Sequence, residues 1–341
     1  MRWFSSRRAR GIGAALAIAA AGAAIGLAPT PALAAPAPPP YTTSRYMQHV
    51  NTQRHYDLGC ALGTRDKNLP GTQGDVVILH YFKPVRFADG TYGADLLGGA
   101  DARTSAIAAA AREFARGYYI CTGSDTTSAL KLAIGTSNDG SAVTYAHGRA
   151  WSQMIQSINN WLTASGFDTQ VDAVGASDIE LGWNTPSVSR AWVDGFSSYC
   201  CPSFYDYGDA AGCRYDGRPA GDECGTSRYP TWTAKDVWWV SYGAVASYPL
   251  PQIYRTDGAM AKQWYGLSLY AKTVQGTAMW VMGSLTQSDA CRSAGCNSTV
   301  ANTPGQGWTQ LWNALNCKYF VSATCPTAQP VLYSTDMSWT D

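Results

Sequence analysis

Short apolar runs alternate with longer segments of helical periodicity along this chain, and this alternation constrains the fold more than any other feature of the sequence. Residues 75–82 (DVVILHYF) form an apolar, β-branched run between Gly74 and Pro84, as expected for a buried strand. Residues 142–165 place their apolar side chains at helical spacing. The same criteria predict strands at 75–82, 118–121, 131–136, 171–179, 203–207, 237–242, 252–254 and 277–282, and helices at 101–116, 142–165, 187–196, 257–274 and 308–315.

Strands that alternate with helices favour a parallel sheet. The chain has 341 residues, and barrels of about 250 residues commonly form one domain. We therefore predict an α/β fold, a single (β/α)8 barrel of the TIM type over residues 73–341, with a Cys-rich loop inserted at 200–229. A doubly wound open sheet is the alternative. Residues 35–72, which begin with a short proline-rich stretch, are predicted to form an N-terminal tether and arm.

The first 34 residues have the features of a secretory signal peptide. Four arginines precede an apolar run over residues 11–28, and Ala32-Leu33-Ala34 resembles a cleavage site. The run Ser6-Arg7-Arg8 leaves twin-arginine export open as the route. A membrane anchor is the alternative, but the flanks of the apolar run fit a signal better. We predict a secreted protein with no membrane span once the signal is removed.

Ten cysteines are consistent with export, because an even number in a secreted chain indicates disulfides. The predicted pairs are Cys60–Cys121, Cys291–Cys296 and Cys317–Cys325, and a further set is predicted to staple one loop: Cys200, Cys201, Cys213 and Cys224. The paired Cys-x-x-Cys spacing of a zinc site is missing from the sequence. We predict no metal and no cofactor.

Charge argues against a nucleic-acid-binding protein. Charged residues make up 14% of the chain, against roughly 25% in average soluble proteins. Loss of the four leader arginines leaves 21 basic and 24 acidic residues, a net charge of −3, whereas nucleic-acid binders normally present a basic face. Complete motifs of phosphate-binding loops, serine hydrolases and zinc proteases are also missing.

Two carboxylates close the fourth predicted strand, at Asp178 and Glu180. Barrel enzymes place their reactive groups at the C-terminal ends of strands. Residues two apart on an extended chain project to the same side. Two carboxylates on one face do not both ionise readily, so one should keep a proton at neutral pH and could serve as a general acid. The alternative is that both are ordinary solvated residues or pair with an arginine.

The motif Asp178-Ile179-Glu180 resembles the fourth-strand signature of chitinase-type glycoside hydrolases of family 18, and also the fourth-strand acid pair of the barrel lysozymes of family 25. Residues 276–280 (GTAMW) resemble the last strand of the chitinase-type barrels, and residues 239–242 (WVSY) resemble their sixth strand. The chain departs from the chitinase pattern D-x-x-D-x-D-x-E, because Ala173 and Ala176 occupy its first two positions.

This resemblance implies a hydrolase of glycans that contain N-acetyl sugars, such as chitin or peptidoglycan. Glu180 would protonate the glycosidic oxygen, and Asp178 would hold the N-acetyl group that acts as nucleophile. Tyr242 would orient that group, and Trp280 would stack against the sugar ring. Further substrate contacts are predicted at Asn138, Trp183, Tyr205 and Gln252.

Two other hypotheses remain open. If a protein carboxylate acts as nucleophile or base, Asp206 and Asp139 are the candidates, and a separation from Glu180 of about 5–5.5 Å would indicate retention and about 6.5–9.5 Å inversion. A catalytically inactive barrel that binds glycan at the cell envelope or outside it is the second, because Ala173 and Ala176 replace supporting acids. In either case we expect a monomer whose partner is a polysaccharide or cell-wall glycan.

Overall fold

Eight parallel strands form a nearly closed barrel in the computed structural model, which describes residues 35–123, 125, 127–199, 202–221, 224–319 and 331–339. Hydrogen-bonded neighbours follow the order β10-β11-β1-β2-β6-β7-β8-β9. The strands are β1 (Thr42–Tyr46), β2 (Gln73–His80), β6 (Ser128–Ser137), β7 (Val171–Asp178), β8 (Phe204–Asp206), β9 (Ser247–Pro249), β10 (Gly283–Thr286) and β11 (Tyr333–Ser338). Chain order and spatial order therefore agree around the barrel, as in a (β/α)8 fold.

The seam between β9 and β10 distinguishes this barrel from an open sheet. The Met282 amide donates to the Pro249 carbonyl oxygen at 2.8 Å, and the Ile253 amide donates to the Leu285 carbonyl oxygen at 2.8 Å. A parallel bridge pairs Gln252 with Leu285 just beyond β9. These bonds join the two outer strands of the sheet, so the predicted barrel is confirmed and the doubly wound alternative is wrong.

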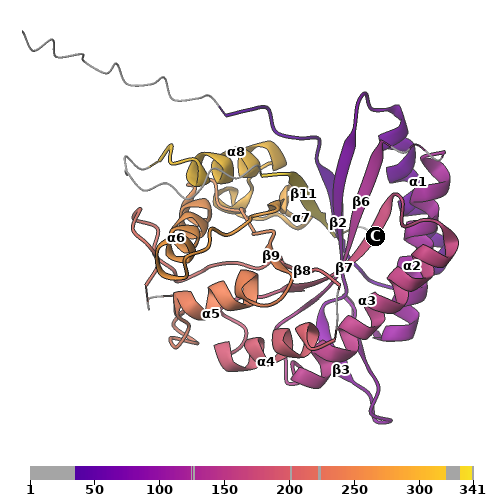
Figure 1. The fold of residues 1–341 in the computed structure, drawn as a ribbon, viewed down its shortest axis with the longest axis horizontal. Helices are drawn as coiled ribbons and strands as arrows, with labels where there is room; N and C mark the ends of the chain where they lie inside the picture. Colours follow the sequence, from indigo (N-terminus) through magenta and orange to yellow (C-terminus); the bar gives the residue numbers. More distant parts are fainter. Residues whose placement is uncertain are drawn as a thin grey trace, which may run out of the picture. The chain divides into compact units, whose positions relative to one another are not determined.

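Helices connect successive strands and lie outside the barrel (Figure 1). They are α1 (Thr52–Asn68), α2 (Thr104–Cys121), α3 (Tyr145–Ser165), α4 (Pro186–Ser197), α5 (Ala234–Trp238) with the π-helical turn η1 (Trp239–Gly243), α6 (Ala259–Val274) and α8 (Pro304–Leu315). One apolar cluster fills the barrel interior and includes Val76, Val174 and Leu285. A larger cluster fills the layer between strands and helices and includes Ile134, Trp151 and Trp192. This two-layer core is the usual arrangement of a filled barrel.

Three predicted strands are wrong, and the strand predicted at 252–254 is only a bridge at Gln252, with β9 lying earlier at Ser247–Pro249. Residues 118–121 form the last turn of α2, where Tyr118 donates to a carboxylate oxygen of Asp66 on α1 at 2.9 Å. Residues 237–242 are helical because Thr233 and Asp236 form a capping box that starts α5, which outweighs the strand propensity of the aromatic run. Residues 277–282 only lead into β10, and the strand itself starts at Gly283.

The barrel strands β1 and β11 lie in segments where no strand was predicted, because they are polar. β1 lies in the segment predicted to be a tether and arm, and β11 follows the last predicted helix. Hydroxyl groups on these strands bond to neighbouring strands: the Ser44 and Thr335 hydroxyl oxygens lie 2.7 Å apart, and Ser44 accepts from the Ile78 amide at 2.8 Å. Barrel strands held in this way lack the apolar runs that sequence analysis searches for.

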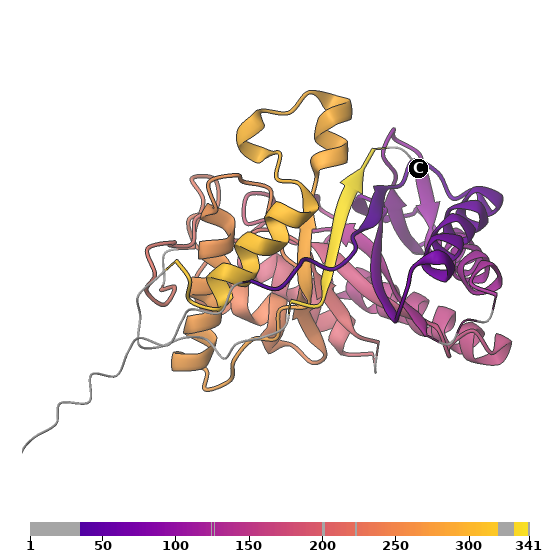
Figure 2. The same cartoon turned by 90° about the horizontal axis from the view of Figure 1, so that it is seen from above.

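Two excursions follow strand ends. A small antiparallel sheet of β3 (Lys83–Arg86), β4 (Tyr92–Asp95) and β5 (Asp101–Arg103) comes after β2. After β10, the segment with α7 (Ser288–Ala294) and the short helix η2 (Ser298–Val300) projects on the side where β11 ends (Figure 2). Both excursions start at the C-terminal ends of strands, the end that carries active sites in barrel enzymes.

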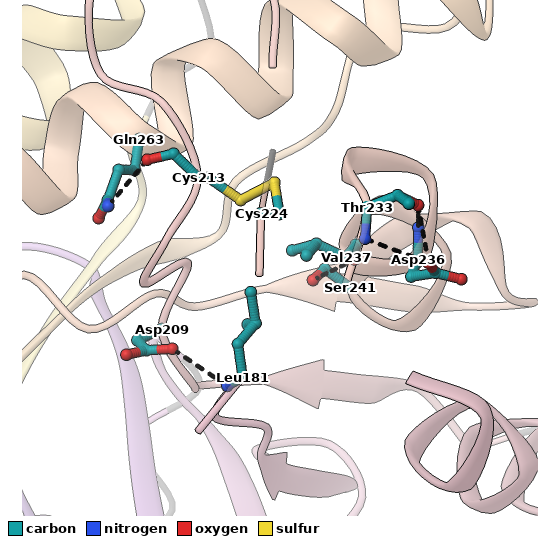
Figure 3. Close-up of a disulfide and its surroundings, with 9 residues drawn as sticks. All are labelled: Leu181, Asp209, Cys213, Cys224, Thr233, Asp236, Val237, Ser241 and Gln263. Carbon is teal, nitrogen blue, oxygen red and sulfur yellow. Dashed lines mark hydrogen bonds between the residues drawn. A yellow bond between two sulfur atoms is a disulfide. The ribbon is translucent and has the colours of Figure 1, made fainter. Parts of the chain in front are cut away.

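Three disulfides lie in the described part of the chain. Cys60–Cys121 links α1 to α2, Cys291–Cys296 closes the end of α7, and Cys213–Cys224 staples the Cys-rich segment (Figure 3). The first two pairings were predicted, and the third falls within the predicted loop staple. Such bonds are typical of an oxidising compartment. Cys200, Cys201 and Cys325 lie outside the described residues, as does the predicted signal peptide at 1–34.

None of the helices in the described ranges has the length and hydrophobicity needed to span a bilayer.

Candidate active site

Asp178 and Glu180 lie together at the C-terminal end of β7. Asp178 is the last residue of the strand and is buried, and Glu180 follows it and is half-buried. The Nε2 atom of Gln252, which lies just beyond β9, donates to Oδ1 of Asp178 at 2.8 Å and to Oε1 of Glu180 at 3.3 Å. The two carboxyl groups therefore share one donor and project to the same side of the chain.

Burial and negative neighbours raise the pKa of both acids. Burial raises the pKa of Glu180 to about 7, and the negative charges of Asp209 and Asp139 add to the increase, while Gln252 opposes it. Burial also raises the pKa of Asp178, with further contributions from Glu180, Asp209 and Asp206. The pair therefore retains a proton near neutral pH, and the two sites titrate as a unit.

Asn138 fixes the backbone of Glu180. It follows the end of β6 and is buried, and its side-chain amide adds hydrogen bonds between the segments that follow β6 and β7. Its Oδ1 accepts from the Glu180 amide at 3.1 Å, and its Nδ2 donates to the Glu180 carbonyl oxygen at 3.0 Å and to the Ser189 hydroxyl at 3.0 Å. Since both contacts with Glu180 are to its backbone, Asn138 orients Glu180 beyond the end of the strand.

Asp206 and Asp209 extend the cluster of acids from β8. Asp206 faces the outside of the barrel, where its carboxylate accepts from the Ser241 hydroxyl at 2.5 Å and from the Gly208 amide at 3.0 Å. Asp209 accepts from the Leu181 amide at 3.4 Å, in the turn after Glu180 (Figure 3). Burial raises the pKa of Asp206 to about 7 and that of Asp209 to about 6.

Aromatic and imidazole side chains from β1, β2 and β11 surround the same end of the barrel. Tyr46 ends β1 and stacks on Trp339, which follows β11, with ring centroids 4.2 Å apart. Its hydroxyl bonds to Tyr254, and its pKa is raised by burial and then by the negative charges of Asp178 and Glu180. The ring of His80, at the end of β2, meets Tyr46 edge-on at 5.2 Å. These contacts put an aromatic surface beside the acid pair.

His80 is held as a neutral imidazole. Its Nδ1 atom lies 2.5 Å from the Tyr207 hydroxyl, which in turn donates to the Thr136 carbonyl oxygen at 3.0 Å. Burial lowers the pKa of His80 to about 3. A neutral imidazole adds no positive charge to the barrel mouth, so it does not offset the mutual repulsion of the acids.

Two predicted substrate contacts lie at the opposite end of the barrel. Trp280 precedes β10, and Tyr242 lies on η1, which precedes β9. Positions before a strand are at its N-terminal end, whereas Glu180 follows the C-terminal end of β7. The Tyr242 side chain bonds to the Trp280 backbone and its ring meets Tyr248 at 6.3 Å, so these residues form a separate group.

The remaining residues predicted for the site lie in different parts of the structure. Tyr205 is buried in the barrel interior, where its ring meets Tyr248 edge-on at 6.4 Å. Trp183 is half-buried in the turn after Glu180, and its amide donates to the Glu180 carbonyl oxygen at 3.2 Å. Asp139 forms an ion pair with Lys83 at 2.8 Å. Of the sequence candidates, the structure brings together Asp178, Glu180, Asn138 and Gln252.

Three residues of this end of the barrel were missed as site residues from the sequence: Tyr46, Asp209 and Trp339. Tyr46 and Trp339 could have been found only by recognising the polar strands β1 and β11. Asp209 lies three residues after β8, in a run that resembles an incomplete calcium loop as much as an active-site loop. Within the residues that the structure describes, no group of three or more His, Cys, Asp or Glu side chains could hold a metal ion.

Comparisons with known proteins do not assign the chain to a family. The sequence matches no protein-family model, and no curated protein matches it. Among solved structures, α-galactosidase I from Mortierella vinacea is similar to the chain, with 11% identity, coverage of 82% of this chain and 71% of that chain, and a TM-score of 0.30. A score of this size supports no inference, so the barrel is assigned from its strand order and hydrogen bonds.

Proposed function

We propose that this chain is a secreted glycoside hydrolase that acts on a glycan containing N-acetyl sugars, such as chitin or peptidoglycan, with Glu180 as general acid. The observation that carries the proposal is that Asp178 and Glu180 accept from the same Gln252 amide in a cluster of buried acids at the C-terminal end of the barrel. A carboxyl group with a pKa of about 7 is suited to donate a proton at neutral pH.

In the proposed reaction, Glu180 transfers its proton to the glycosidic oxygen as the bond between that oxygen and the anomeric carbon breaks. The carbonyl oxygen of the substrate N-acetyl group bonds to the anomeric carbon as the glycosidic bond breaks, and Asp178 holds and polarises that group. Water then displaces that oxygen at the anomeric carbon and gives a proton to Glu180, which completes the hydrolysis. Asp206 is a poor candidate for a protein nucleophile, because its carboxylate is occupied by Ser241 and Gly208 outside the barrel. Asp139 is less suited as well, because Lys83 already pairs with it.

We further propose that Trp339 supplies the aromatic surface for the sugar. The role was predicted for Trp280, but that residue lies at the end of the barrel away from Glu180. The stacked pair of Trp339 and Tyr46 lies at the end where the acids are, and the apolar face of a sugar ring packs well on such rings. Secretion and binding of a polysaccharide remain parts of this proposal.

A barrel that binds glycan without cutting it is the second candidate function. It is favoured by Ala173 and Ala176, which stand where the chitinase pattern has two acids that support the third. Both alanines are fully buried. Asp209 is then the acid whose charge raises the pKa of Glu180 most.

Hydrolysis of chitin oligomers and peptidoglycan fragments by the wild type and Glu180→Gln distinguishes the two functions. We expect the wild type to release shorter oligomers, and Glu180→Gln to lower kcat at least about 100-fold, as for loss of a general acid. Asp172→Asn is the matched control, because Asp172 lies near the start of the same strand and pairs with Lys131 at 2.7 Å. Binding without turnover by the wild type would support the inactive barrel, and neither binding nor turnover would refute both.

A further inference from the structure

Gln252 is buried at the seam of the barrel, and its side chain is aimed at the two acids. The residue is 3% exposed. Its backbone is fixed on both sides, because its amide donates to the Gly208 carbonyl oxygen at 3.1 Å and the residue bridges to Leu285. The position of its Nε2 atom, 2.8 Å from Asp178 and 3.3 Å from Glu180, is therefore set by closure of the barrel.

An amide nitrogen donates hydrogen bonds and cannot accept them. The two oxygens that face Nε2, Oδ1 of Asp178 and Oε1 of Glu180, must then act as acceptors, and the bond favours an unprotonated oxygen, which is the stronger acceptor. The proton that the pair retains is left to the other oxygen of each group, Oδ2 of Asp178 or Oε2 of Glu180. Glu180 is the more exposed of the two side chains, so Oε2 is the oxygen from which a substrate at the barrel mouth could receive it.

We propose that Gln252 is a positioning residue, which holds the inner oxygens of both acids as hydrogen-bond acceptors and so leaves the shared proton to their outer oxygens, of which Oε2 of Glu180 is the one that a substrate can reach. The inference rests on the proposed function only for the use of that proton. Gln252 was expected from the sequence to contact substrate, whereas its nitrogen is already engaged with both acids. It acts on the substrate through Glu180.

Titration of the carboxyl groups by carbon NMR tests the proposal without any substrate. Signals of Asp178 and Glu180 are assigned from their loss in Asp178→Asn and Glu180→Gln. Gln252→Met removes the donor at nearly constant side-chain volume, and both apparent pKa values of the pair should rise by about one unit, a tenfold tighter hold on the proton, because hydrogen bonds to the ionised form have been lost. Unchanged pKa values in folded Gln252→Met would overturn the proposal.

Gln263→Met is the matched control. Gln263 is also a buried glutamine, but it lies on α6 and donates to the Cys213 carbonyl oxygen at 3.0 Å, away from the acid pair (Figure 3). The pair should titrate in this variant as in the wild type. If Gln252→Met does not fold, Gln252→Asn withdraws the donor by one methylene and should raise the same pKa values, and no rise would again overturn the proposal.

The result also separates this inference from the proposed function. A wild type that hydrolyses no glycan while Gln252→Met shifts the titration would refute hydrolysis and leave the role of Gln252 intact. If the wild type is active, both limbs of its pH–rate profile should move to higher pH in Gln252→Met. A purely structural role would lower the rate without moving the limbs.

Discussion

At the scale of single residues, burial of acidic side chains governs the chemistry of the barrel mouth. Asp178, Glu180, Asp206 and Asp209 are brought together by the ends of β7 and β8, and the pKa of each is raised chiefly by burial. The pairing of Asp178 with Glu180 was predictable, because two residues two apart on a strand share a side. The contribution of Asp209 was not, because it depends on how the loop after β8 folds back.

Asp206→Asn should change how stability depends on pH. The pKa of Asp206 is about 7 in the folded protein, above its unfolded value near 3.8. Its contribution to the free energy of unfolding is therefore full below about pH 4 and is lost as pH rises to about 7. The variant lacks this loss, so its free energy of unfolding relative to the wild type should increase with pH by up to about 1.4 kcal/mol per unit over that interval. Urea unfolding at pH 4, 5.5 and 7 measures the difference, which should not be constant.

Titration of His80 does not affect the comparison between Asp206→Asn and the wild type. Its pKa is about 3 when folded, below the unfolded value of 6.5, so its contribution is lost as pH falls. His80 is present in both proteins, and its contribution cancels in the difference between Asp206→Asn and the wild type.

Asp209→Asn should lower the pKa of Glu180. Asp209 is the first negative charge that raises it, after burial. Removing that charge makes the proton of Glu180 easier to lose, so the alkaline limb of hydrolysis should move to lower pH by about one unit. The pH–rate profile of the two proteins on the same oligomer measures the shift, and an unmoved or higher limb would show that Asp209 does not act on the general acid.

At the scale of elements, local sequence signals explain both the correct and the wrong predictions of helices and strands. Long helices such as α3 and α6 follow from apolar spacing and were predicted close to their bounds. The run 237–242 became helical because of the Thr233–Asp236 capping box, a signal that lies upstream of the aromatic residues that suggested a strand. Polar β1 and β11 carry no signal of their own and are strands because their neighbours in the barrel complete their hydrogen bonds.

The contact between α1 and α2 requires glycine at the crossing. A Cβ added to Gly117 would lie 2.1 Å from the Tyr56 carbonyl oxygen, and one added to Gly59 would lie 2.0 Å from that of Phe114. Gly117→Ala should therefore force the helices apart and lower the free energy of unfolding by about 1–3 kcal/mol or more. Denaturant unfolding tests this.

Gly305→Ala is the control for that substitution. Gly305 is also in a helix, α8, but a Cβ there would meet nothing nearer than 3.8 Å. Stability should stay the same or increase slightly, since alanine restricts the unfolded chain. Equal losses in the two variants would mean that the helix crossing is not the cause.

At the scale of the whole molecule, the direction of the strands divides the barrel into two ends with different properties. The acids, Gln252, Tyr46 and Trp339 occupy the C-terminal end, and Tyr242 and the half-exposed Trp280 occupy the other. The fold class was predictable from the alternation of elements. The end on which Trp280 lies was not, because a shift in where β10 begins exchanges one end of the barrel for the other.

Trp339→Ala and Trp280→Ala should therefore differ in their effects. Loss of the Trp339 ring should raise KM for glycan oligomers about tenfold, as expected for an aromatic contact worth about 1–1.5 kcal/mol. Trp280→Ala should leave kcat and KM within about twofold of the wild type. Steady-state kinetics on both variants measures this, and the reverse order of effects would assign substrate binding to the N-terminal end.

The central claim is that Glu180 donates a proton to a glycan bound at the C-terminal end of the barrel. The most direct test is a crystal structure of Glu180→Gln soaked with an N-acetylglucosamine oligomer. We expect a glycosidic oxygen within hydrogen-bond distance of residue 180, a sugar ring stacked on Trp339, and an N-acetyl group beside Asp178. An oligomer bound around Trp280, or one at the barrel mouth with no glycosidic oxygen near residue 180, would contradict the account.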